Sequence, residues 1–235
     1  MKIACISDLH GNLIQYPSKY WDGLEECEAL FICGDILPLK IQYNMPKSKE
    51  WLLSEFKLWA LDLPVEKIYI IAGNHDTWFE RNEAAARSMF SEHDKITYLK
   101  NNKLEHISIQ DGKVYTIFGT PYCHIFGDWP FMREEETLRK NFSHIPQNID
   151  ILFCHDAPFG TSDICLEGWA ADGKHKGCPA LRDAILEKKP KYCFHGHLHS
   201  TNHDVELLEE TKVYNTSILD ESYRIKYHPL IIRIE

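Results

Sequence analysis

Five short apolar runs, each followed at once by polar residues, dominate the hydrophobic pattern of this 235-residue chain. The runs are rich in Ile, Phe, Tyr and Cys, which is typical of strands buried on both faces of a sheet. They occupy residues 2–10, 29–35, 67–76, 150–156 and 191–199. The third run, KIYIIAGNHD, ends abruptly in Gly-Asn-His-Asp. The pattern therefore predicts buried strands whose ends collect polar side chains.

Helical segments separate some of these runs. We predict helices at residues 48–63, 80–93 and 179–189. The first repeats apolar residues on one stripe, the second is rich in Ala and Glu, and the third opens with Pro at the first helical position. This alternation of strands and helices predicts an α/β layered fold with much parallel pairing. In such sheets, ligands bind outside the carboxyl ends of the strands, where the polar clusters lie.

Three more apolar segments extend the predicted sheet structure. Residues 113–120, 211–219 and 228–235 are expected to be strands. They fit mixed or antiparallel pairing, and we expect a second sheet. The chain contains no internal repeat, low-complexity segment or linker, so we predict a single domain over residues 1–235.

The acidic composition limits the classes of partner. The formal net charge is -9, which disfavours stable binding to nucleic acid or to an anionic membrane. No apolar run approaches the roughly 18 residues needed to span a bilayer. The start, MKIACISDLHGN, lacks a long apolar region and a cleavage site, so we do not expect a signal peptide. The pattern predicts neither nucleic-acid nor membrane binding and leaves the oligomeric state open.

The eight cysteines are scattered, and several lie inside apolar runs, where Cys behaves as a small hydrophobic residue. The sequence has no Cys-x-x-Cys pair, so a thiolate zinc site is not expected. We predict a reduced, cytoplasmic location.

The polar residues at the run ends form a set typical of metal ligands. The set is Asp8, His10, Asp35, Asn74, His155, His197 and His199. Mixed nitrogen and oxygen donors suit Mn, Fe, Zn or Co better than Ca or Mg. Seven groups exceed one tetrahedral site but suffice for two ions if one carboxylate bridges. Residues i and i+2 of an extended segment point the same way, so Asp8 and His10 are expected to reach one region, as are His197 and His199.

Each motif alone has an ordinary explanation. Asp-x-His and Gly-Asn-His-Asp are common in turns, and Gly-His-x-His is compatible with surface histidines. Five apolar runs that all end in metal-type residues are improbable by accident, and the conjunction favours a metal centre.

The motifs DLH, GD, GNHD, H and GHLH, in this order over residues 8–199, resemble the calcineurin-like metallophosphoesterase family. The resemblance implies a four-layer α/β/β/α sandwich, with two mixed sheets flanked by helices and the metal site at the carboxyl ends of the strands. It also implies two metal ions, drawn from Mn, Fe and Zn. Here GD is followed by Ile-Leu-Pro rather than by the charged residue of many members.

The resemblance also assigns roles. The first ion would be held by Asp8, His10, Asp35 and His199. The second would be held by Asp35, Asn74, His155 and His197, with Asp35 bridging. His75 would contact the phosphate and donate a proton to the leaving oxygen. Asp76 would either orient His75 or hold the turn.

We therefore predict a hydrolase that cleaves a small phosphodiester or a cyclic nucleotide, by attack of a hydroxide that bridges the metal ions. Residues 117–131, HDAP and the Gly-Cys before LRDAI bear a weaker resemblance to a metallophosphoesterase-domain subgroup related to vertebrate brain proteins, which is associated with cyclic nucleotide phosphodiesterase activity. The alternatives are a phosphomonoesterase and a non-catalytic protein-binding scaffold. A DNA nuclease and a lipid-pyrophosphate hydrolase fit less well, because the chain offers no basic face or basic flap.

Substrate selection is expected to come from loops. Residues 156–178 form a long irregular segment that predicts a pocket wall. The candidate substrate-binding residues are Tyr122, His124, Trp169, Lys174 and His175. The alternative for the aromatic residues is core packing, and for the charged residues a solvated loop tip.

Overall fold

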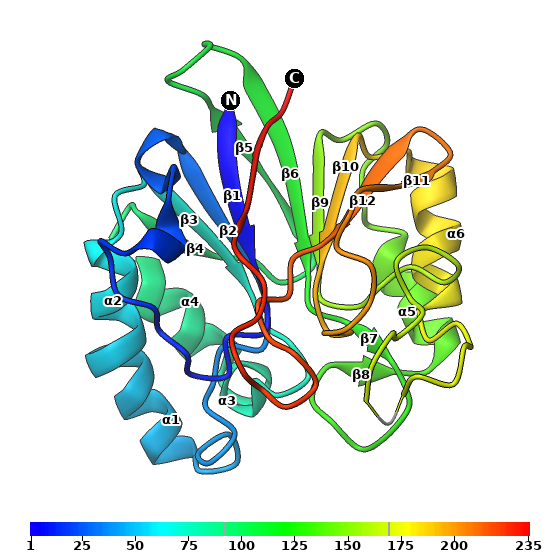
Figure 1. Ribbon diagram of the computed structural model, residues 1–235, viewed down its shortest axis with the longest axis horizontal. Helices are drawn as coiled ribbons and strands as arrows, with labels where there is room; N and C mark the ends of the chain where they lie inside the picture. Colours follow the sequence, from blue (N-terminus) through cyan, green and yellow to red (C-terminus); the bar gives the residue numbers. More distant parts are fainter. Residues whose placement is uncertain (92, 169) are drawn as a thin grey trace.

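Two sheets of five and six strands pack face to face in the described residues, 1–91, 93–168 and 170–235, of the computed structural model (Figure 1). The first sheet, in the order β13-β1-β2-β3-β4, contains β1 (Lys2–Ile6), β2 (Ala29–Cys33), β3 (Lys67–Ile71), β4 (Ile96–Tyr98) and β13 (Leu230–Arg233). The second, in the order β11-β12-β10-β9-β6-β5, contains β5 (Asn102–Ile107), β6 (Val114–Thr120), β9 (Ile151–Cys154), β10 (Tyr192–His195), β11 (Glu206–Leu208) and β12 (Thr211–Asn215). A small pair is formed by β7 (Cys123–His124) and β8 (Met132–Arg133).

Helices cover the outer face of each sheet (Figure 1). The first sheet is covered by α1 (Met45–Trp51), a π-helical segment η3 (Leu52–Phe56), α2 (Lys57–Asp62), α3 (Thr77–Arg81) and α4 (Glu83–Ser91). The second is covered by α5 (Glu135–Phe142) and α6 (Pro179–Lys188). Two 3-10 turns, η1 (Lys19–Trp21) and η2 (Leu24–Glu26), follow β1. This arrangement confirms the predicted four-layer sandwich.

The apolar runs are buried on both faces, as predicted. In β1, Ile3 and Cys5 pack between the sheets, whereas Ala4 and Ile6 pack under the helices. Each of the five runs forms a strand that ends before the predicted ligands of that run. Burial of alternating apolar side chains in two separate cores explains why these runs carry so few polar positions.

The helix predictions are confirmed with shifted bounds. Asn44 caps α1 by accepting the backbone N–H of Lys47, so the first helix begins earlier than residue 48. The predicted helix at 80–93 is instead α3 and α4. Asn82 breaks it, because its φ of -132° is not helical and its side chain donates to the carbonyl of Trp78. Helix α5 was not predicted from the sequence.

The late strands divide between the two sheets. β13 pairs antiparallel with β1, whereas β12 and β6 pair parallel with β10 and β9. The second sheet is confirmed, and it also contains two of the five predicted apolar runs. A parallel bridge from Ser7 to Ser217 joins the sheets beyond β1 and β12, so the carboxyl ends of both sheets meet at one edge. Within the described part of the chain, every helix is too short or too polar to cross a bilayer.

Candidate metal centre

The seven predicted ligands follow the strands directly and lie at this shared edge. Asp8 and His10 follow β1, Asp35 follows β2, Asn74 follows β3, His155 follows β9, and His197 and His199 follow β10. Both carboxylates are almost completely buried, at 0% exposure for Asp8 and 2% for Asp35. Buried carboxylates require compensating partners, which here are imidazoles and backbone amides.

The backbone at the strand ends is strained. Asp8, His10, Asp35 and His197 have φ values of 57°, 43°, 53° and 69°. Such left-handed conformations cost about 1–3 kcal/mol each for residues with a side chain and persist where the surroundings fix them. Asp8 and His10 converge as predicted, but through this left-handed turn rather than through an extended i, i+2 segment.

Glycines leave room for the ligands. A Cβ at Gly196 would overlap Ser7 Oγ and meet Asp8 Oδ2 at 2.5 Å. A Cβ at Gly73 would lie 2.5 Å from the backbone nitrogen of Asp35. These two positions exclude any larger residue unless a ligand moves.

The first cluster contains Asp8, His10 and His199, whose donor atoms lie within 4.8 Å of one another. His199 Nδ1 donates to the backbone carbonyl of Asp220 at 3.1 Å, and Nε2 lies 3.5 Å from Asp8 Oδ1. Both ring nitrogens of His10 are buried without a hydrogen-bond partner. A buried nitrogen atom without a hydrogen-bond partner is energetically costly. A metal ion bound by such a nitrogen and by the neighbouring carboxylates would remove this cost.

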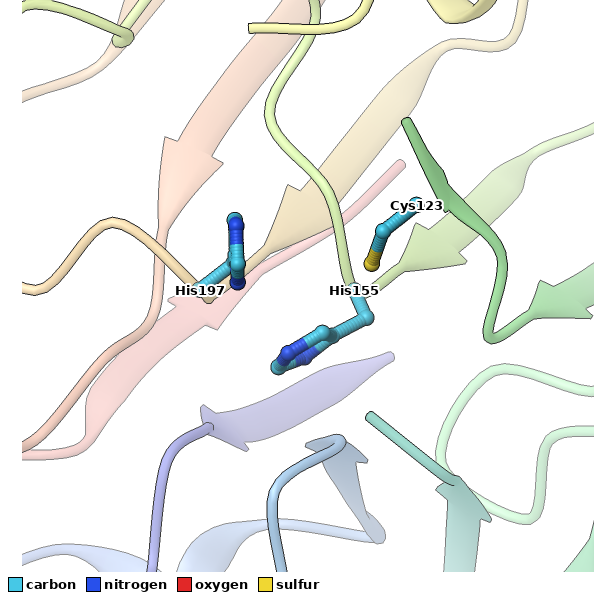
Figure 2. Close-up of side chains that lie close together, drawn as sticks. All are labelled: Cys123, His155 and His197. Carbon is cyan, nitrogen blue, oxygen red and sulfur yellow. The ribbon is translucent and has the colours of Figure 1, made fainter. Parts of the chain in front are cut away.

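The second cluster is built around His155. Its Nδ1 donates to the carbonyl of Cys33 at 2.7 Å, which leaves Nε2 as the free donor atom, 2.9 Å from Asn74 Oδ1 and 3.4 Å from Asp35 Oδ1. Figure 2 shows His155, His197 and Cys123 around a common space, and their donor atoms lie within 4.8 Å of one another. Burial, followed by the nearby carboxylates, raises the pKa of the Cys123 thiol well above its usual value, which disfavours a thiolate ligand.

Asp35 lies between the clusters. Its Oδ2 is 3.5 Å from His10 Nε2, and its Oδ1 faces His155. Burial opposes the charge, but the histidines outweigh it and hold the pKa of Asp35 well below its usual value, as they do for Asp8.

The imidazoles divide into two groups. Burial alone lowers the pKa of His155 and His199, but Asp35 and Asp8 respectively raise it to about 10 and about 9. Burial dominates at His10 and His197 and lowers the pKa of each to about 4. The clusters therefore combine anionic carboxylates with both protonated and neutral imidazoles. This donor set fits divalent Mn, Fe or Zn, because these ions accept mixed nitrogen and oxygen ligands.

His75 lies beside the clusters. Its Nε2 is 4.0 Å from Asp35 Oδ2, and its Nδ1 donates to Gln42 Oε1 at 2.8 Å. Asp76 instead accepts the backbone N–H groups of Ile36 and Gly73, among others, so it holds the turn rather than orienting His75. Of the two roles left open for Asp76, these hydrogen bonds fit the structural one. Gln42 belongs to no recognisable motif, and the sequence analysis missed it.

A cavity of about 580 Å³ opens beside the clusters. Predicted substrate residues His124 and His175 line it. His124 Nδ1 donates to buried Asp156 at 2.8 Å, and His175 Nδ1 donates to Asp163 at 2.7 Å. The irregular segment 156–178 supplies part of the wall, as predicted.

Two other predicted substrate residues, Tyr122 and Lys174, lie outside the described cavity lining. Tyr122 is half-buried, and it packs against two hydrophobic cores and the ring of Phe131. Lys174 is exposed at the loop tip and lies outside the described cavity wall, whereas Lys176 lines it. Trp169 lies outside the described residues. Tyr223 also lines the cavity, and it was not predicted from the sequence.

Carboxylates and imidazoles that gather at the joined carboxyl ends of two facing sheets define a metal-binding α/β/β/α sandwich. Residues 1–201 match the family model described as calcineurin-like phosphoesterase, and the chain belongs to this family. The resemblance found in the motifs is thereby confirmed.

Relatives cover nearly all of the chain. A UPF0046 protein of Caenorhabditis elegans is 27% identical over 250 residues, covering 100% of this chain and 81% of the relative. Human metallophosphoesterase domain-containing protein 1 is 25% identical over 248 residues, covering 98% and 70%. The solved structure of a Thermus thermophilus protein, TT1561, has a TM-score of 0.59 at 13% identity, covering 91% of this chain and 88% of that chain, a likeness of fold alone.

Proposed function

We propose that the protein is a two-metal phosphodiesterase that acts on a small phosphodiester, with a cyclic nucleotide as one candidate substrate. The observation that carries the proposal is the position of Asp35. Its Oδ2 faces His10 of the first cluster, and its Oδ1 faces His155 of the second cluster. A carboxylate placed in this way is suited to bridge two ions. When bound, such ions activate water and offset charge on the phosphoryl oxygens.

Hydrogen bonds from the histidine rings to backbone carbonyls orient the nitrogen atoms that would bind metal. The carbonyls of Cys33 and Asp220 accept the Nδ1–H groups of His155 and His199, so each ring presents Nε2. Carbonyl partners of this kind fix the tautomer and the orientation of a metal-binding histidine. Asp8 also accepts the backbone N–H of His197, which holds the two turns together.

His75 is the proposed proton donor to the leaving oxygen. The Gln42 oxygen accepts its Nδ1–H, so Nε2 is the atom directed away from Gln42. Burial lowers the pKa of His75 and Asp35 opposes this shift, which keeps a proton on the ring more readily than burial alone would. Proton donation matters most for an unactivated ester, whose alkoxide is a poor leaving group.

The charge of the cavity wall favours a diester over a monoester. Three nitrogen-bearing side chains of the described wall already lie beside a carboxylate: His124 beside Asp156, His175 beside Asp163, and Lys176 beside Asp172. A diester carries one negative charge at pH 7, whereas a monoester carries nearly two and needs more unpaired cations. His124 and His175 are proposed to contact the substrate as hydrogen-bond donors.

The test is a comparison of two model substrates on protein reconstituted with Mn²⁺. We expect bis-p-nitrophenyl phosphate to be cleaved with a kcat/KM at least about tenfold above that for p-nitrophenyl phosphate. A ratio below one would favour the phosphomonoesterase. Metal binding without turnover of either ester would favour the scaffold, and a pull-down would follow.

The described cysteines support a reducing compartment for this activity. All eight are free and buried. We therefore propose a cytoplasmic location, which fractionation of cells that express a tagged chain would test. Recovery of the tagged chain in a secreted or membrane fraction would contradict it.

A further inference from the structure

Three aromatic side chains surround the histidines of the metal centre. The Trp129 ring centroid lies 4.5 Å from that of His75, Phe126 lies 5.1 Å from His197, and Tyr223 lies 4.9 Å from His10. All three aromatic residues line the cavity. We call Phe126, Trp129 and Tyr223 the aromatic collar.

Tyr223 differs from the other two because it lies beyond the residues that match the family model, which end at residue 201. It lies in the turn between Leu219 and Ile225, which form an antiparallel bridge. In Figure 1 this segment is the red-orange loop near the lower ends of the strands. Nothing in the family match therefore assigns a role to Tyr223.

The turn is built to hold Tyr223 in place. Asp220 Oδ1 accepts the backbone N–H groups of Ser222 and Arg224, and the carbonyl of Asp220 accepts that of Tyr223. Glu221 accepts the N–H of Ser200, which ties the turn to the segment that carries His199. Asp220 itself orients His199 through its carbonyl.

The conformation of Tyr223 is strained in the same way as the ligands. Its φ is 59°, a left-handed value that is uncommon for an aromatic residue. Its ring packs edge to face on both His10 and His199, yet 42% of the residue remains exposed. A strained, half-exposed aromatic ring that borders a cavity offers one apolar face to a ligand.

We propose that Tyr223 is a specificity-determining residue that packs against a planar aromatic substituent on the phosphoryl group. The inference rests on the proposed function, because the phosphoryl group has to bind at the metal centre. The ring of Tyr223 is the contacting part, and its hydroxyl is dispensable. Stacking on an aromatic side chain contributes to the affinity for planar groups such as nucleic-acid bases, so removal of the ring should weaken binding about tenfold.

The experiment measures binding rather than turnover. Protein loaded with Mn²⁺ is titrated calorimetrically with phenylphosphonate and with methylphosphonate at pH 6, where each ligand carries mainly one negative charge, as a phosphodiester does. The variants are Tyr223→Ala, Tyr223→Phe and Ile225→Ala. Alanine keeps a Cβ at the strained position, phenylalanine keeps the ring, and Ile225→Ala alters the same turn at an exposed side chain.

Tyr223→Ala is expected to weaken phenylphosphonate about tenfold and methylphosphonate less than twofold. Tyr223→Phe and Ile225→Ala should match the wild type for both ligands. Equal weakening of both ligands would show that Tyr223 acts through the metal centre, and no weakening would show that its ring makes no contact; either result overturns the proposal. Absence of phosphonate binding by the wild type overturns both this proposal and the proposed function. If the protein prefers the phenyl ligand but hydrolyses no ester, the proposed hydrolase activity is overturned and the role of Tyr223 in binding stands.

Discussion

At the scale of single residues, the site depends on polar partners that fix each functional ring. His75 contacts Gln42, His155 contacts the carbonyl of Cys33, and His199 contacts the carbonyl of Asp220. The partner lies 33 residues away for His75 and 122 residues away for His155. Such pairs are set by tertiary packing, so the ring could be predicted from its motif but its partner could not.

Replacing His75 by Ala should affect esters according to their leaving group. We expect kcat for a dialkyl phosphodiester, which can expel only an alkoxide, to fall by about 10²–10⁴, because the alkoxide then departs without a proton. Cleavage of bis-p-nitrophenyl phosphate should fall much less, since p-nitrophenolate needs no protonation. Steady-state kinetics on both esters measure the difference. Equal losses would contradict the role of His75 as an acid.

Gln42 should act through His75. Gln42→Ala is expected to lower kcat for the alkyl ester about tenfold, within the range typical of groups that orient a functional histidine. Gln42→Glu should raise the pKa of His75, because it places a carboxylate at the ring, and should move the alkaline limb of the pH–rate profile to higher pH. Tyr43→Ala, at an exposed neighbour, is the control. An unmoved limb in Gln42→Glu would remove Gln42 from the mechanism.

At the scale of elements, the strand ends decide the site. The ligands could be predicted because apolar runs of similar length end in polar residues, and parallel strands bring their carboxyl ends to one edge. The left-handed backbone conformation at Asp8 and His197 could not be predicted from the sequence, because hydrogen bonds between neighbouring turns fix it. The turn that carries Tyr223 was also missed, since its only local signal is a polar sequence. Its position depends on contacts with residues far along the chain.

Gly196→Ala tests the close approach of the turns. A Cβ there overlaps Ser7 and crowds Asp8, so we expect a loss of about 1–3 kcal/mol in the free energy of unfolding and at least tenfold weaker Mn²⁺ binding. Urea unfolding and calorimetry measure the two effects. Gly173→Ala is the control, because its Cβ meets no heavy atom within 4 Å and only its φ of 73° is strained. Equal Mn²⁺ affinity in the two variants would refute the steric explanation.

At the scale of the whole molecule, metal binding should be coupled to proton release. In the metal-free protein the pKa of His155 is raised to about 10 and that of His199 to about 9. Both rings are therefore cationic at pH 7, with a proton on each ring nitrogen. A metal ion has to displace these protons. Affinity for Mn²⁺ should therefore increase as pH rises from 6 towards 9.

Calorimetry in two buffers of different ionisation enthalpy counts the protons. We expect at least one proton released per chain at pH 7, and fewer at pH 9.5. The same raised pKa values stabilise the metal-free fold most below pH 6.5, and this contribution is lost as pH rises through 9 to 10. A proton count of zero at pH 7 would mean that neither ring binds metal.

A two-metal site bridged by Asp35 is best tested by measuring metal stoichiometry and turnover together. Metal-stripped protein is titrated with Mn²⁺ while bound metal and hydrolysis of bis-p-nitrophenyl phosphate are followed, in the wild type and in Asp35→Asn. We expect two ions per wild-type chain, with turnover appearing as both sites fill. Asp35→Asn should bind fewer ions and lose more than about 10⁴-fold in kcat, beyond the range of about 10²–10⁴ that is typical of losing a general acid. Full activity with one ion, or with asparagine at position 35, would contradict the bridged two-metal site.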